Sequence, residues 1–321
     1  MYRLANGDLW SGRIDSDNAC DYRFHQVIKL QNIDKLKQSE SAFGFIGFAS
    51  DEGVRRNKGR AGASLAPDEI RKHLAKLPYN LNRNMETIDY GNVICEDDQL
   101  EKAQEELGKK VYSLLLHHKT PIILGGGHET FYGHYLGVRE YFSADKTIGI
   151  VNIDAHFDLR SDKLPSSGTM FRQILEQDVK AGYLCLGIQE FGNTESLFQA
   201  AKDFGCQYVL EEDIDLNNIQ NTYKKIDEFI KKYDSIIMTL CTDSIISSAA
   251  PGVSAPSPLG LDPKIVKRLL KYIAAKKNTI SFDISEVNPN VDENDKTVRL
   301  AAYLVAETMK SFSLKEKLAM I

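Results

Sequence analysis

Residues 148–158 read Ile-Gly-Ile-Val-Asn-Ile-Asp-Ala-His-Phe-Asp, a mainly apolar run that ends in alternating acidic and imidazole side chains. A run that is apolar at consecutive positions is typical of a strand buried on both faces, as in a parallel sheet between helices. Side chains two residues apart in an extended chain share a face. We therefore expect Asp154, His156 and Asp158 to point together into one site at the end of this strand.

This cluster predicts a bound metal ion. Acidic and imidazole groups without partners would be costly to hold at the end of a buried strand. A divalent cation offsets that cost, and carboxylate combined with imidazole suits manganese, iron or zinc. The alternative is a solvated polar loop, which the buried strand before it disfavours.

Apolar runs alternate with amphipathic stretches along most of the chain. Residues 100–114 and 265–273 carry apolar side chains at helical spacing. The pattern predicts one α/β domain over residues 1–321, with a mostly parallel sheet between helices and an irregular polar arm at about residues 1–40. The further strands are expected at Phe43–Phe48, Ile122–Leu124, Tyr183–Ile188, Tyr208–Leu210, Ile236–Leu240 and Ile280–Ile284.

In open α/β sheets the site forms outside the carboxyl ends of the strands, so the residues after each run are the candidates for function. After Ile122–Leu124 come three glycines and then His128. This segment is either part of the metal site or a glycine-rich turn with an incidental histidine. A phosphate-binding loop is disfavoured because the lysine and hydroxyl of that motif are missing.

Two more strand ends carry acids. Thr239-Leu240-Cys241-Thr242-Asp243 follows one strand, and Ser281-Phe282-Asp283-Ile284-Ser285-Glu286 forms another. Cys241 is either a ligand or a small buried core residue, which is a common role for a free cysteine. Glu286 can pair with a cationic substrate group or orient a metal ligand, and a plain buried salt bridge is the alternative.

Composition excludes several classes of partner. The 321 residues carry a net charge of −5 and no basic block, so neither nucleic acid nor a membrane surface is expected as partner. No secretory signal and no run of about 18 apolar residues is present. The five widely spaced cysteines are typical of reduced thiols in a cytoplasmic protein.

Together the four strand ends resemble the arginase superfamily, whose signatures are Gly-Gly-x-His, Asp-Ala-His-x-Asp, Ser-x-Asp-x-Asp and Glu-Val-Asn-Pro. The matches occur in the same order and cover roughly residues 40–310. The resemblance implies an arginase-like three-layer α/β/α fold with a mainly parallel eight-stranded sheet and a pair of Mn²⁺ ions. It also leads us to expect a homo-oligomer.

The resemblance also implies the role of each site residue. Asp154 would bridge the two ions, Asp158 and Glu286 would be catalytic, and Glu286 would grip the amidine nitrogens of the substrate. A hydroxide held by the metals would attack the amidine carbon. The metal ligands implied in this way are His128 and Asp158 for one ion, His156 and Asp243 for the other, with Asp154 between them and Cys241 beside them.

Within the superfamily, three features resemble the formimidoylglutamases: the segments 57–63 and 250–256, and Arg160. Arginine binds carboxylates bidentately and would repel a cationic substrate such as arginine or agmatine. The resemblance therefore implies hydrolysis of N-formimino-L-glutamate to L-glutamate and formamide, a step of histidine breakdown. The residues expected to contact the substrate are Asn57, Arg60, Arg160, Ser167 and Glu286.

Two positions depart from the family pattern. Phe171 stands where arginases have a proton-shuttling histidine, which disfavours arginase activity. Cys241 stands where the family has its second bridging aspartate, and a soft thiolate suits Mn²⁺ poorly. We therefore expect the second ion to be held more loosely or to be a different metal. The alternative functions are another amidine or guanidino-acid hydrolase, or a catalytically silent relative that binds a small acid.

Overall fold

A computed structural model describes the backbone of residues 1–36, 42–82 and 85–319, and side chains as far as residue 314. Its centre is one twisted sheet with the strand order β1-β4-β3-β5-β10-β9-β6-β7-β8, and β2 pairs with β4 beside this path. The strands are β1 (Tyr2–Arg3), β2 (Lys29–Leu30), β3 (Ala42–Ala49), β4 (Glu86–Ile94), β5 (Lys119–Leu124), β6 (Ile148–Ile153), β7 (Ala181–Ile188), β8 (Gln207–Leu210), β9 (Ser235–Cys241) and β10 (Thr279–Ser285).

The eight strands β3 to β10 pair with one another in the parallel sense, as predicted. Every strand that the sequence predicted is present. The sequence did not predict β4, because Asp89 and Asn92 interrupt its apolar pattern. Both are buried, and Asp89 forms an ion pair with the buried guanidinium of Arg71 at 2.8 Å. The pairing of Asp89 satisfies a charge that would otherwise disfavour a buried strand.

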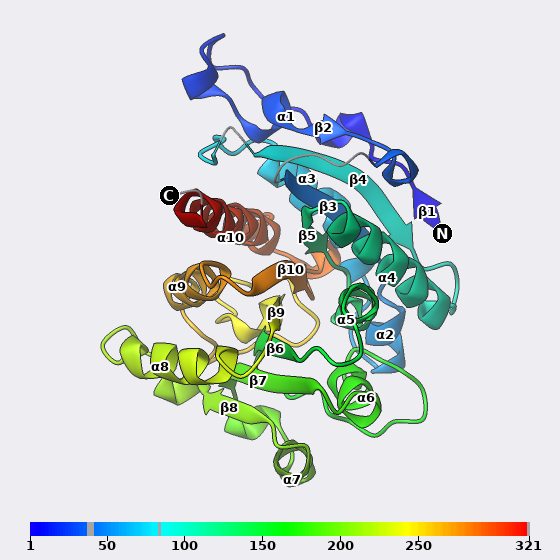
Figure 1. The fold of residues 1–321 in the computed structure, drawn as a ribbon, viewed down its shortest axis with the longest axis vertical. Coiled ribbons are helices and arrows are strands. Elements are labelled where there is room, and N and C mark those ends of the chain that lie inside the picture. The colour runs from blue at the N-terminus through cyan, green and yellow to red at the C-terminus, as the bar shows by residue number, and fades with distance from the viewer. Residues whose placement is uncertain (37–41, 83–84, 320–321) are drawn as a thin grey trace.

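Helices cover both faces of the sheet, and each face has its own apolar core (Figure 1). One core contains residues of α3, α8, α9 and α10, and the other contains residues of α4, α5, α6 and α7. The helices are α1 (Phe24–Val27), α2 (Glu52–Arg56), α3 (Ala66–Leu74), α4 (Leu100–Leu116), α5 (Thr130–Tyr141), α6 (Met170–Gln177), α7 (Glu195–Asp203), α8 (Ile219–Ile230), α9 (Pro263–Ala274) and α10 (Lys296–Ala319).

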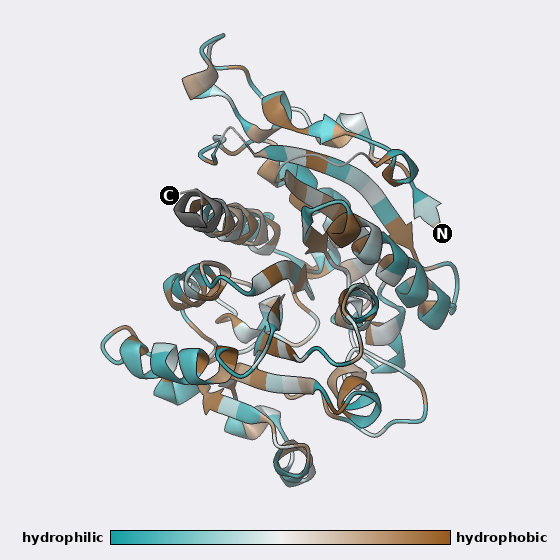
Figure 2. Cartoon of the chain, in the orientation of Figure 1, coloured by the Kyte–Doolittle hydropathy of each residue, from teal (hydrophilic) through white to brown (hydrophobic). Residues whose placement is uncertain are grey.

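Hydrophobic residues are concentrated along the strands, and the outer sides of helices such as α8 are hydrophilic (Figure 2). This distribution is what a sheet buried between two helical layers requires. Among the helices that the structure describes, none has both the length and the apolar character needed to cross a bilayer.

The N-terminal segment lies along the β4 side of the sheet (Figure 1). β1 pairs with β4 in the antiparallel sense, and β2 pairs with it in the parallel sense. Trp10 donates a hydrogen bond from Nε1 to Asp89 at 2.8 Å, which attaches the segment to the buried ion pair. Residues 37–40 of the predicted arm lie outside the described residues.

Four neighbouring strands, in the order β5-β10-β9-β6, precede the polar segments that the sequence selected. Because neighbouring parallel strands end at the same edge of a sheet, these four segments come together although they are far apart in the sequence. The registers pair Leu124 with Ile284, Ser285 with Cys241, and Leu240 with Ile153. The sheet therefore places all four candidate segments at one edge.

Candidate active site and metal centre

The turn after β5 brings its backbone against two other strand ends. A Cβ atom on Gly126 would lie 1.8 Å from the carbonyl oxygen of Ser50, so only glycine fits there. Gly126 in turn accepts a hydrogen bond from the amide of Glu286 at 2.8 Å. The amide of His128 donates to Oε1 of Glu286, also at 2.8 Å. This close packing holds the imidazole of His128 and the carboxylate of Glu286 beside one pocket.

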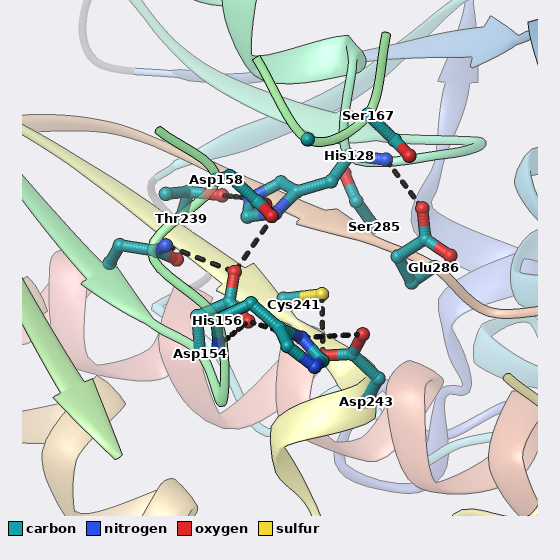
Figure 3. Close-up of polar contacts among 12 residues, drawn as sticks. His128, Asp154, His156, Asp158, Ser167, Thr239, Cys241, Asp243, Ser285 and Glu286 are labelled. Carbon is teal, nitrogen blue, oxygen red and sulfur yellow. Dashed lines mark hydrogen bonds and ion pairs between the residues drawn. The ribbon is translucent and has the colours of Figure 1, made fainter. Parts of the chain in front are cut away.

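His128, Asp154 and Asp158 form the inner half of the site (Figure 3). Nδ1 of His128 lies 3.1 Å from a carboxylate oxygen of Asp154 and 3.1 Å from one of Asp158. The His128 side chain is only 1% exposed and that of Asp154 is fully buried. One ring nitrogen thus faces two carboxylates at the buried end of the site.

His156 and Asp243 form the outer half, where the histidine side chain is 29% exposed, and Cys241 lies between the halves, with its sulfur within 4.8 Å of ligand atoms of His128 and Asp154. Nδ1 of His156 lies 3.5 Å from Asp243 and 3.6 Å from Asp154. The thiol of Cys241 donates a hydrogen bond to Oδ1 of Asp243 over 2.8 Å. Within the described part of the chain, no hydrogen bond reaches the other ring nitrogen of His156.

Asp154 belongs to both halves. Potential ligand atoms of His128, Asp154 and Cys241 lie within 4.8 Å of one another, and so do those of Asp154, His156 and Asp243. Its carboxylate is fixed by the amide of His156 at 2.9 Å and by the side-chain amide of Asn152 at 3.1 Å. A carboxylate shared by two groups of ligands is the arrangement expected of a bridge between two ions.

The electrostatics of the pocket favour positive charge. Burial alone would lower the pKa of His128 and of His156, but hydrogen bonds to the neighbouring aspartates and the charges of these groups raise both pKa values well above the usual value. Burial, and then the charge of Asp154, raises the pKa of Asp158 to about 6. Burial raises the pKa of Asp154 less than its hydrogen bonds to His128 and His156 lower it, so the net shift is downward.

These shifts provide a test of whether a metal fits. The pocket gathers three aspartates and Glu286 around the two histidines, and the raised pKa values of these histidines reflect the negative charge of the aspartates beside them. A divalent cation supplies compensating positive charge directly and binds the same oxygen and nitrogen atoms. The residues present therefore fit a pair of divalent cations.

Two acids of the site have an unusual backbone conformation. Asp158 has a φ of 51° and Glu286 a φ of 68°, both in the left-handed region that is costly for residues other than glycine. Asp158 therefore reaches the cluster through a turn in the backbone. The sequence prediction placed Asp158 by the side-chain alternation of an extended strand, but the strand β6 ends at Ile153, before Asp158.

Three of the predicted substrate contacts lie together beside the metal cluster. Nη1 of Arg160 donates to the side-chain oxygen of Asn57 at 3.0 Å, and Asn57 donates to the hydroxyl of Ser167 at 3.2 Å. All three line a cavity of about 250 Å³, which His128, Asp158 and Glu286 also line. One part of the cavity wall therefore carries candidate ligand atoms. Another part carries Arg160, Asn57 and Ser167, which we call the cationic row.

Arg60 has a different position from the one expected of a substrate contact. It is not among the described residues that line the cavity. Its guanidinium donates to the carbonyl oxygens of Val253 and Ser254, and its backbone amide donates to the Ser254 hydroxyl at 2.8 Å. Asn288 donates from the other side to the carbonyl oxygen of Arg60 at 2.9 Å. Arg60 thus joins two loops at the rim of the cavity.

Three residues that support the site were not predicted from the sequence. Asn193 accepts a hydrogen bond from the amide of Phe157 and donates to Ala155 and Gln189, which holds the loop that carries His156. Asn152 supports Asp154, and Thr239 contacts His128. Asn193 follows β7, so the strand-end rule could have selected it. The other two lie inside strands, where no such rule applies.

Phe171 lies in the apolar core between α6 and the sheet. Its ring stacks on Tyr183 with centroids 4.3 Å apart and packs edge-on against His128 at 5.5 Å. At this position the chain therefore offers a rigid apolar contact to the inner half, without an ionisable group.

Comparison with known proteins gives one consistent result. Residues 41–310 match the model of the Arginase family. A formimidoylglutamase from a Geobacillus species is 52% identical over 99% of both chains. The structure of formiminoglutamase from Trypanosoma cruzi with Mn²⁺ is 25% identical, with a TM-score of 0.79 over 91% of this chain and 99% of that one. The formimidoylglutamase of Bacillus subtilis is also 25% identical, with a TM-score of 0.77 over 94% and 96%.

Proposed function

This chain belongs to the arginase family, and we propose that it is a hydrolase that cleaves N-formimino-L-glutamate into L-glutamate and formamide. In this reaction water adds to the formimino carbon, the bond from that carbon to the glutamate nitrogen breaks, and the nitrogen takes up a proton. The observation that carries the substrate assignment is the row Arg160–Asn57–Ser167 in the same cavity as the ligand cluster.

Two Mn²⁺ ions would fit the cluster: His128 and Asp158 would hold one, His156 and Asp243 would hold the other, and Asp154 would serve both. When bound, such a pair lowers the pKa of water and stabilises the charge that develops on the substrate. Cys241 is a softer neighbour than the carboxylate expected at its position. Burial raises the pKa of its thiol well above the usual value, and nearby acids raise it further. We infer that the outer ion is held more loosely than the inner one.

Glu286 orients the formimino group. One of its carboxylate oxygens accepts the amide of His128, so the other is available to accept an N–H of the substrate. Asp158 lines the same cavity, and one of its carboxylate oxygens lies 3.1 Å from Nδ1 of His128. In our proposal Asp158 receives the proton of the attacking water and passes it to the departing glutamate nitrogen.

The cationic row selects the rest of the substrate. Nε of Arg160 pairs with Asp162 at 3.0 Å and Nη1 donates to Asn57, so in our proposal the remaining N–H groups of the guanidinium donate to a substrate carboxylate. The hydroxyl of Ser167 and the amide of Asn57 add further polar contacts. Arginine and agmatine carry a positive charge where formiminoglutamate carries carboxylates, so Arg160 disfavours them. Arg60 contributes through the loop at residues 253–254, which it holds in place.

A substrate panel tests this proposal against its rivals. Protein stripped of metal and reloaded with Mn²⁺ is offered formiminoglutamate, arginine, agmatine and guanidino acids, and formamide, urea and bound metal are quantified. We expect formamide from formiminoglutamate and two ions per chain. Turnover of a guanidino acid alone would assign a different hydrolase of the family. Folded protein that binds metal but turns over none of these substrates would be a catalytically silent relative.

We also place the enzyme in the cytoplasm, since its five cysteines are free and two of them are buried. We treat residues 1–321 as one domain, because a continuous sheet includes strands from both the N-terminal segment and the C-terminal part. A homo-oligomer is expected from family resemblance, and light scattering on the purified protein measures it.

A further inference from the structure

A chain of buried hydrogen bonds extends from the ligand His128 away from the cavity and into the core. Nε2 of His128 lies 3.1 Å from the hydroxyl oxygen of Thr239, which donates to Oδ1 of Asp283 at 2.7 Å. The other oxygen of Asp283 lies 2.7 Å from Nδ1 of His134 on α5, and Nε2 of His134 lies 2.7 Å from the hydroxyl of Ser281. The side chains of Thr239, Asp283, His134 and Ser281 are all fully buried.

The direction of these bonds determines which nitrogen of His128 carries hydrogen. A threonine hydroxyl has one hydrogen, and Thr239 uses it toward Asp283. Its oxygen must therefore accept from His128, so Nε2 of His128 carries a hydrogen. Nδ1 is then the nitrogen that faces Asp154 and Asp158 and can give its lone pair to an ion.

Asp283 fixes this direction because a carboxylate only accepts. It accepts the Thr239 hydroxyl on one oxygen and the Nδ1–H of His134 on the other. Without that acceptor, the hydroxyl of Thr239 could rotate and donate to His128, which would favour the wrong tautomer. A neighbour that fixes the tautomer of a ligating histidine also raises its basicity.

We propose that Thr239, Asp283 and His134 are positioning residues that hold His128 in the tautomer and orientation that bind the inner ion. This inference rests on the proposed function in one respect, that His128 ligates a metal. None of the three residues lines the cavity, so each acts through the ring of His128. Removal of such a partner typically lowers metal affinity about 10- to 100-fold.

The test is titration of Mn²⁺ into metal-free protein, which requires no substrate and therefore does not depend on the reaction. Thr239→Val keeps the shape of the side chain but removes the acceptor, whereas Thr239→Ser keeps the hydroxyl. We expect Thr239→Val to weaken one ion about 10- to 100-fold and to leave the other within about threefold. Thr239→Ser should bind both ions as the wild type does. The paramagnetic resonance of the Mn²⁺ pair should change to that of isolated ions in Thr239→Val only.

Thr308→Val is the matched control. Thr308 is equally buried, but its hydroxyl donates to the carbonyl oxygen of Leu304 within α10, which contributes no residue to the cavity. It should lose some stability and no metal affinity. A double-mutant cycle identifies the ion concerned, because Thr239→Val should have no further effect once His128→Asn has removed the inner ligand.

Asp283→Asn and His134→Asn alter the chain of hydrogen bonds one and two steps beyond Thr239, and the same Mn²⁺ titration measures their effect. Both should weaken the same single ion, His134→Asn less than Asp283→Asn, and they decide the matter if Thr239→Val does not fold. Unchanged binding of both ions in the folded variants would overturn the proposal, and so would equal weakening of both ions. If the wild type binds Mn²⁺ normally but does not hydrolyse formiminoglutamate, the proposed reaction is wrong and this inference is unaffected.

Discussion

The two halves of the metal site differ in what surrounds them. In the inner half, His128 is 1% exposed and both of its ring nitrogens have partners, one toward the acids and one toward Thr239. In the outer half, His156 is 29% exposed, and Asp243 accepts a hydrogen bond from the thiol of Cys241. At the edge of a sheet, one side of a site contacts the buried residues of the core, and the other side faces solvent. The inner half is therefore shaped by the fold, and the outer half depends more on the ions themselves.

The largest effect is expected where the two halves meet. Asp154→Asn removes the shared carboxylate, so neither ion keeps its full set of ligands. We expect less than one Mn²⁺ per chain and a fall in kcat/KM of at least about a thousandfold, since the ions contribute several kcal/mol to transition-state stabilisation. Elemental analysis and formamide release measure the two quantities.

Asp203→Asn, at an exposed position on α7, is the control and should match the wild type. Two tightly bound ions in Asp154→Asn would show that the halves are independent and that the comparison above is mistaken.

Substrate binding should be separable from both halves. Arg160→Ala removes charge-assisted hydrogen bonds to a carboxylate, so the KM for formiminoglutamate should rise about 10- to 100-fold. The number of bound ions should stay the same. Steady-state kinetics and elemental analysis check this, with Arg172→Ala on α6, outside the cavity, as the control. A change in metal content with unchanged KM would assign Arg160 to the metal site.

Cys241→Asp should make the outer half more like the inner one. The added carboxylate is a harder ligand for Mn²⁺ than the thiol and lies beside ligands of both halves, so the outer ion, which we infer to be the looser one, should gain most and bind about tenfold more tightly. The metal-free variant should be less stable than the metal-free wild type, because it buries another acid among acids. Metal titration and thermal unfolding provide the readouts. An unchanged outer affinity would mean that Cys241 does not face the ion.

The smallest effect concerns pH. In the metal-free protein the pKa of Asp158 is raised from 3.8 to about 6, and the pKa values of His128 and His156 are raised well above 6.5. The folded state therefore binds more protons than the unfolded chain, and its stability falls as pH rises. Between pH 6 and 8 we expect the unfolding midpoint to fall by about 2–5 °C per pH unit.

Saturating Mn²⁺ should abolish or reverse this slope, because ions bind the deprotonated ligands. His128→Asn should remove more of the slope than His156→Asn, since His156 is partly exposed. Equal contributions, measured by calorimetry over the same pH range, would contradict the difference between the halves.

The sequence predicted the strands and the main ligands because both depend on short-range patterns. Consecutive apolar residues identified seven of the eight strands β3 to β10, and the candidate site residues that follow four of these strands lie together in the structure. It did not predict β4, because the partner that makes Asp89 acceptable in a strand, Arg71, lies on α3. It did not predict the role of Thr239, because that role depends on a partner on another strand. Both omissions have the same cause, which is a polar residue satisfied by a distant part of the chain.

Arg60 shows how a motif can leave the partner of a side chain open. Its place in the segment 57–63 suggested contact with the substrate. Its guanidinium instead donates hydrogen bonds to the main-chain carbonyls of Val253 and Ser254, almost two hundred positions later in the chain. The side chain type was informative about hydrogen bonding and not about its partner.

The contacts made by Arg60 also have a consequence for how the protein is made. The rim of the cavity joins residue 60 to residue 254, and Asn288 then closes it from the C-terminal side. A growing polypeptide cannot build this rim until nearly nine-tenths of the chain has left the ribosome. Contacts of such long sequence separation form late in folding. Substrate binding by a nascent or truncated chain is therefore a stringent sign that folding is complete.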